Sequence, residues 1–166
     1  MTSEMSGLAI DIDRLKSVFS FRVEGIRLVV PSYNVVGVIA FEPPTRVPRT
    51  PSHILGLLPY GDGALAVVDL ANFLEIPKQQ AQADIAAVHR VIVTRDRDLE
   101  AGFLCNQTHG VMPFDNAQLE TSTVLKSGRL AEFVSWELDD AQSRVGLLNL
   151  ASVLENARVG STRGER

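Results

Sequence analysis

The side chains that could do chemistry in this 166-residue chain include one cysteine and three histidines. Cys105 and His109 are four residues apart, and a cysteine activated by a histidine can act as a nucleophile. A free cysteine is more often a small buried hydrophobic residue, so we favour a structural role for Cys105. No two histidines among His53, His89 and His109 have the helical spacing of a metal-binding pair. The sequence predicts no catalytic residue, no metal and no cofactor.

Asp69 is the acid with the most informative setting. The segment VVDLANFLE (67–75) is repeated as LLNLASVLE (147–155), where Asn149 takes the place of Asp69. Aspartate and asparagine are both favoured helix N-caps, because their side-chain oxygen accepts a hydrogen bond from a free helix N–H group. A position that takes either residue does not require a titrating carboxylate. We therefore predict that Asp69 and Asn149 are structural helix caps.

Composition limits the remaining functional classes. The formal net charge is −4 and the pI is near 5.4, which disfavours nucleic-acid binding. The longest apolar run, residues 35–41, is too short to span a membrane. The first residues have neither the basic start nor the apolar segment of a signal peptide. These features predict a cytoplasmic protein without direct membrane insertion.

The apolar pattern predicts many short strands separated by turns. Alternating residues predict a hairpin from strands 18–23 and 26–30. Four prolines between 43 and 51 predict an extended connector. Further strands are predicted over 35–41, 54–60, 64–68, 88–94, 100–105, 110–114, 119–124, 130–138 and 144–150, and short helices over 70–75 and 151–157. In the strand 88–94, we expect His89 to face outward. The series of short strands separated by turns indicates an all-β fold with a few short helices.

The domain organisation follows from composition and from the internal repeat. We predict an N-terminal tail over 1–14 and a C-terminal tail over 158–166. The domain between them, 15–157, is predicted to have two lobes of roughly 15–80 and 81–157, which could exchange end strands.

The order of these motifs resembles the CheW-like family, the coupling proteins of bacterial chemosensory arrays. The resemblance runs from about Ser17 to Glu155. Its motifs are an opening hairpin and third strand, a glycine followed by a strand, a turn and a strand ending V-V-D-L, a second hairpin, and a closing strand and helix. In this chain they read VFSFRVEGIRLVVPSYNVVGVI, ILGLLPYGDGALAVVDL, LEAGFLCNQTHGV and SRVGLLNLASVLE.

The resemblance implies both a fold and a function. The fold would be two five-stranded SH3-like barrels packed side by side. The function would be that of a non-catalytic adaptor, which couples chemoreceptor tips to the regulatory domain of a chemotaxis-type histidine kinase. The pathway would be of the chemotaxis or the type IV pilus type.

Two positions depart from the family pattern. The residues 59–62, PYGD, stand where the family usually carries N-L-R-G, and Gly37 replaces the glutamate of V-x-E-V. Loss of a charge at an interface rim changes partner choice and encounter rate more than folding. We expect protein contacts at Val35, Gly37, Val38, Ile39, Leu57, Tyr60, Gly61 and Asp62.

Two rival functions remain open at this point. The first is a divergent module of the same fold that binds another protein or a small ligand, and a roomy apolar pocket would favour it. The second is an enzyme that uses Cys105 and a histidine.

Overall fold

The structure is a computed structural model that describes residues 14–78, 89–115, 119–121, 128–140 and 143–157. Residues 1–13 and 158–166 of the predicted tails lie outside this range, as does the predicted lobe boundary near residue 80.

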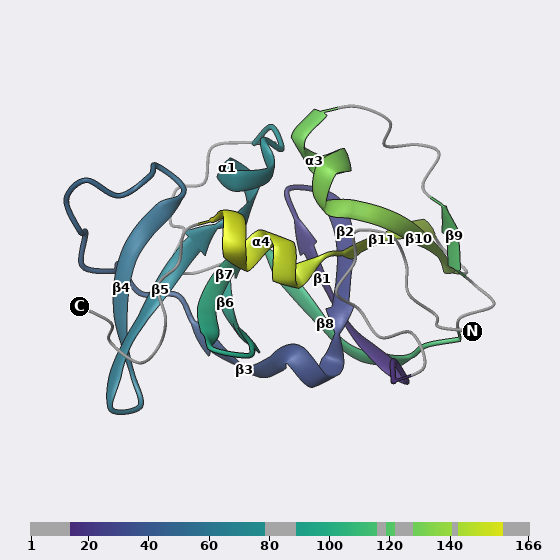
Figure 1. The fold of residues 1–166 in the computed structure, drawn as a ribbon, viewed down its shortest axis with the longest axis horizontal. Coiled ribbons are helices and arrows are strands. Elements are labelled where there is room, and N and C mark those ends of the chain that lie inside the picture. The colour runs from purple at the N-terminus through teal and green to yellow at the C-terminus, as the bar shows by residue number, and fades with distance from the viewer. Residues whose placement is uncertain (1–13, 79–88, 116–118, 122–127, 141–142, 158–166) are drawn as a thin grey trace.

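The described chain folds into short strands and shorter helices (Figure 1). The strands are β1 (Ser17–Val23), β2 (Ile26–Pro31), β3 (Val35–Ala40), β4 (Ile54–Tyr60), β5 (Gly63–Asp69), β6 (Arg90–Asp96), β7 (Leu99–Cys105), β8 (Gln107–Pro113), β9 (Leu119–Thr121), β10 (Val134–Asp140) and β11 (Ser143–Leu148). The helices are η1 (Ser32–Asn34), α1 (Leu70–Leu74), α3 (Gly128–Phe133) and α4 (Leu150–Asn156).

The strands form two sheets that lie side by side, with α4 between them in the view of Figure 1. One sheet has six strands in the order β8-β1-β2-β11-β10-β9, and the other has five in the order β3-β6-β7-β5-β4. The predicted all-β fold with a few short helices is therefore confirmed. The structure differs in detail from the predicted pair of five-stranded barrels. Within the described residues neither sheet closes into a barrel, and one sheet has six strands.

The sheets do not follow the order of the chain. The N-terminal strand β2 pairs in parallel with the C-terminal strand β11, with Leu28 opposite Gly146. In the other sheet β5 pairs in parallel with β7, with Val67 opposite Gly102. Strands from the two ends of the domain thus share one sheet, and strands from its middle form the other.

The side chains on the two faces of the central strands pack into separate hydrophobic clusters. Successive side chains of a strand point to opposite faces, and on β1 both faces are buried. Phe19 and Phe21 enter a central cluster, whereas Val18 enters a second cluster with Val29 and Leu147. The central cluster takes residues from both sheets and from α1, α3 and α4, including Val68, Ile92, Phe103, Leu148, Leu70, Phe73, Phe133, Leu150 and Leu154.

Two local predictions are wrong, one over residues 130–138 and the other at His89. The strand predicted over 130–138 begins only at Val134, because residues 128–133 form α3. Leu130 and Phe133 are three residues apart, so they share one helical face, and both pack at the central cluster. His89, predicted to face outward, is only 5% exposed and precedes β6.

Candidate docking surfaces

Asp69 is the N-cap of α1. The residue ends β5 with φ −79° and ψ 96°, outside the helical region, and its Oδ1 accepts a hydrogen bond from the Asn72 backbone N–H at 3.3 Å. Its Oδ2 lies 3.2 Å from Lys78 Nζ. The carboxylate is buried and both of its oxygens have partners within the chain, which gives it a structural role.

Asn149 has the equivalent place at the start of α4. It follows β11 with φ −80° and ψ 87°, and its Oδ1 accepts from the Ser152 backbone N–H at 3.3 Å. Its own N–H donates to the Phe133 carbonyl at 2.8 Å. The repeat recognised in the sequence thus corresponds to two copies of one local geometry, a strand followed by a capped short helix.

Cys105 does not have the properties of a nucleophile. The thiol is buried at the end of β7, and burial raises its pKa from 9.0 to about 12, against smaller opposing effects of a backbone hydrogen bond at Gln107 and the charge of Arg90. A nucleophilic cysteine needs a substantial thiolate fraction. At neutral pH the Cys105 thiol stays protonated.

The histidines lie on three different segments. His53 Nε2 is 2.9 Å from the Ala157 carbonyl, and its ring packs edge-on against Phe73. His109 is exposed on β8, where desolvation and the charges of Arg27 and Arg22 lower its pKa. Within the described residues, no group of three or more histidines, cysteines and acids could hold a metal ion.

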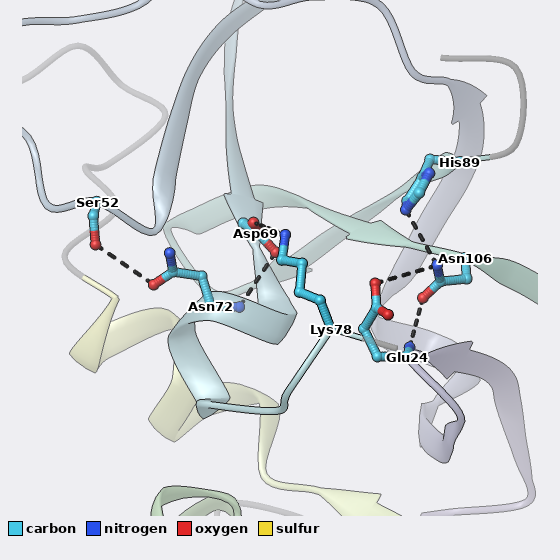
Figure 2. A network of polar contacts seen from close by, with 7 residues as sticks. All are labelled: Glu24, Ser52, Asp69, Asn72, Lys78, His89 and Asn106. Carbon is cyan, nitrogen blue, oxygen red and sulfur yellow. Dashed lines mark hydrogen bonds and ion pairs between the residues drawn. The ribbon is translucent and has the colours of Figure 1, made fainter. Parts of the chain in front are cut away.

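A polar network joins the two sheets at one side of the molecule (Figure 2). Asn106, in the crossover from β7 to β8, accepts at Oδ1 from the Glu24 backbone N–H at 2.6 Å. This contact orients the amide so that its Nδ2 donates to His89 Nε2 at 3.2 Å. Together with Asp69 and Lys78, these side chains line a cavity of about 190 Å³. No local pattern in the sequence indicates this network, because its members are brought together only by the pairing of distant strands.

A second cavity of about 220 Å³ lies between the end of α1 and α3. Arg129 forms part of its wall. Its guanidinium stacks over the Phe73 ring at 4.6 Å, and its Nε donates to the Phe73 carbonyl at 2.8 Å. Arg129 therefore ties the two helices together.

The predicted contact residues of β3 lie on an outer strand of the five-stranded sheet. Exposure alternates along β3: Val38 is 40% exposed, whereas Val35 and Ile39 are half-buried and pack against separate hydrophobic clusters. Gly37 is half-buried, and nothing lies within 4 Å of the position of a Cβ atom there.

Two further exposed residues adjoin this strand. Val36 is 44% exposed and shares the outward face of β3 with Val38, and Tyr33 of η1 is 38% exposed. Val36 lies within the predicted contact range 35–39, and the two-residue period of the strand places it beside Val38. Tyr33 was not among the predicted contacts.

The predicted contact residues of β4 lie at the opposite edge of the same sheet (Figure 1). Leu57 is half-buried and pairs with Thr45 of the preceding connector, and Tyr60 packs at the cluster beneath the sheet. Gly61, with φ +58°, and Asp62 form the exposed tip of the β4–β5 hairpin. The predicted contacts therefore lie at two separate edges of the sheet. From the exposed residues at these edges we define two surfaces, the β3 surface (Tyr33, Val36 and Val38) and the β4–β5 tip (Tyr60, Gly61 and Asp62).

No helix in the described ranges is long and apolar enough to cross a membrane. The described chain thus combines two sheets with a shared core, short helices capped by Asp69 and Asn149, and outer strands with exposed residues.

These features and the sequence define the class of this protein. The chain belongs to the CheW-like domain family, whose family model matches residues 17–158. It is 31% identical to Protein FrzA of Myxococcus xanthus over 142 residues, which cover 84% of this chain and 86% of that protein. It is 30% identical to Chemotaxis protein CheW of Thermotoga maritima over 114 residues, which cover 68% of this chain and 72% of that protein.

A solved structure has the same fold. The crystal structure of the scaffolding protein TtCheW from Thermoanaerobacter tengcongensis matches with a TM-score of 0.69 and 20% sequence identity. The match covers 80% of this chain and 88% of that chain. The resemblance read from the sequence is thereby confirmed at the level of family and fold.

Proposed function

We propose that this chain is a non-catalytic adaptor that couples chemoreceptors to a chemotaxis-type histidine kinase in a bacterial chemosensory system. The observation that carries the proposal is the match of the CheW-like family model over residues 17–158, together with relatives whose names include Chemotaxis protein CheW and FrzA. The adaptor binds the regulatory domain of the kinase and the tip of the receptor. It does so in the cytoplasm.

The side chains that could do chemistry support a non-catalytic role. The carboxylate of Asp69 is held by a helix N–H group and by Lys78. The thiol of Cys105 is buried, with a pKa of about 12. Both groups therefore have structural roles.

The rival function, a small-ligand module, is less well supported. Pockets that bind small ligands usually measure about 300–1,000 Å³. The cavities lined by Asn106 and by Arg129 measure about 190 and 220 Å³. Both are below that range, and the polar groups in the wall of the first already bind one another.

The two surfaces are proposed as the docking sites of the adaptor. The β3 surface presents apolar side chains on an outer strand, and such a strand also offers backbone groups for pairing with a partner. The β4–β5 tip presents Asp62, whose charge is opposite to that of the arginine usual in the family. We therefore expect the cognate partner to carry a group whose charge complements that of Asp62.

The test is direct binding to the cognate partners. The kinase regulatory domain and a receptor cytoplasmic fragment encoded in the same genome are purified, and each is titrated against the immobilised full chain by interferometry. We expect saturable binding of each partner and a ternary complex when both are present. Failure of the folded chain to bind either partner would contradict the proposal.

A further inference from the structure

The connector between β3 and β4, residues 41–53, is held in a defined conformation. Thr45 and Leu57 exchange both backbone hydrogen bonds, at 2.9 and 2.8 Å. The Ile54 N–H donates to the Pro51 carbonyl at 3.0 Å. Four prolines fix the backbone dihedral φ at their positions. We call this segment the connector loop, and it projects beside β4 at one end of the molecule (Figure 1).

Gly56 makes this attachment of the connector loop to β4 feasible. Its φ is +147°, and a Cβ atom there would lie 2.3 Å from the Thr45 carbonyl oxygen. Only glycine allows the two backbones to approach so closely. The position of the connector loop is therefore built into the sheet.

The most exposed part of the connector loop is a turn that carries an arginine in an unusual backbone conformation. Thr50 Oγ1 donates to the Val47 carbonyl at 2.9 Å across the turn, in which Pro48 precedes Arg49. Arg49 has φ +65°, a value that turns of this kind usually assign to glycine or asparagine. The chain thus keeps a long cationic side chain where a smaller residue would be less strained.

The charges of the connector loop are not neutralised by the described part of the protein. Arg46 and Arg49 are both exposed, and neither has an ion pair among the described residues. Glu42 is the one acid of the segment and precedes its first two prolines. By contrast, Arg95 and Arg97 of the β6–β7 hairpin lie near Glu100 and Asp96. In a chain of net charge −4, this loop is a local positive site.

We propose that the connector loop docks an acidic segment of the kinase regulatory domain, with Arg46 and Arg49 each pairing a carboxylate. The inference rests on the proposed function and adds a contact surface to it. Arginine binds carboxylates through two parallel hydrogen bonds, and a preformed loop loses little conformational freedom on binding. The loop pairs with β4 and therefore extends the β4–β5 edge of the proposed docking site. Two cations alone bind an anionic membrane only weakly, which favours a protein partner.

The experiment compares charge reversal, charge removal and a matched control. The titration with the kinase regulatory domain is repeated for R46E/R49E, for R49G and for R97G. R97G removes another exposed arginine that also has a positive φ, +57°. We expect R46E/R49E to weaken binding about tenfold at low salt and less at high salt, because exposed charges are screened.

The glycine variants separate folding from docking. Glycine suits a positive φ, so we expect R49G to unfold at the same or a higher temperature than the wild type while its binding weakens. We expect R97G to bind within about twofold of the wild type, since its charge lies away from the connector loop and beside Asp96.

The outcomes distinguish this inference from the function on which it rests. If the wild type binds the kinase domain and R46E/R49E binds equally well, the inference is wrong and the proposed function stands. If the wild type binds neither kinase nor receptor, both fail. If R46E/R49E loses binding only to vesicles of phosphatidylserine and phosphatidylcholine, the loop contacts membrane and the inference is wrong.

Discussion

At the scale of single residues, Asp69 shows how a buried acid can stabilise a fold without taking part in chemistry. Its carboxylate caps α1 and pairs with Lys78, whose side chain is 58% exposed. An ion pair to so exposed a partner contributes little, so the cap supplies most of the stabilisation.

Replacing Asp69 separates the cap from the charge. We expect Asp69→Ala to lower the free energy of unfolding by about 1 kcal/mol, because the Asn72 N–H loses its acceptor. Asp69→Asn keeps an acceptor, as Asn149 does in the second copy, and should lose less. Urea unfolding measures both, and loss of partner binding by a folded Asp69→Asn variant would instead indicate a functional charge.

Cys105 offers a second test at this scale. With a pKa of about 12, its thiol forms almost no thiolate at pH 8, and labelling by iodoacetamide requires the thiolate. We expect slow labelling of the native chain at pH 8 and fast labelling in urea, where the pKa returns towards its usual value. Equally fast labelling of the native chain would contradict the burial of Cys105.

At the scale of elements, β3 shows what could be predicted from the sequence and what could not. Its β-branched residues predicted a strand, and β3 is observed over nearly the predicted range. A continuous apolar run does not reveal which residues face the core. In the structure Val36 and Val38 are exposed, whereas Ile39 packs inward.

The β3 surface gives a prediction for partner binding. We expect Val36→Asp/Val38→Asp to weaken binding to the kinase domain or the receptor by at least about tenfold, because a charge would be buried against an apolar partner. Interferometry measures binding, and circular dichroism checks folding. Val111→Asp is the matched control, since Val111 is an exposed valine on β8, an outer strand of the other sheet. An equal effect of the control would argue against a specific β3 surface.

Other elements were harder to predict for physical reasons. Residues 130–133 read as a strand because Leu130 and Phe133 are apolar, yet their helical spacing decides the structure. The parallel pairing of β2 with β11 joins segments more than a hundred residues apart, and local propensity carries no information about it. The network around Asn106 depends on such pairings, so it was not predicted.

At the scale of the whole molecule, the central cluster makes the two sheets one folding unit. Phe73 is 2% exposed and lies at the middle of this packing. Its ring contacts those of His53 and Phe133, each with centroids 5.0 Å away, and Arg129 stacks over it. Its loss would affect both sheets.

We expect Phe73→Ala to lower the free energy of unfolding by about 3–5 kcal/mol, because it leaves a cavity in the shared core. Amide exchange should then accelerate in β6 and β7 of one sheet and in β1 and β2 of the other, since both contribute to the central cluster. Phe73→Leu, which fills more of the space, should lose less. Faster exchange in one sheet alone would show that the sheets unfold independently.

The parallel pairing of β2 with β11 also bears on how the protein is made. As the chain leaves the ribosome, the β1–β2 hairpin emerges before its neighbour β11, which is synthesised more than a hundred residues later. The β3 strand likewise waits for β6 before it has a described partner. The β1–β2 hairpin therefore lacks one of its final neighbours until more than a hundred further residues have been synthesised.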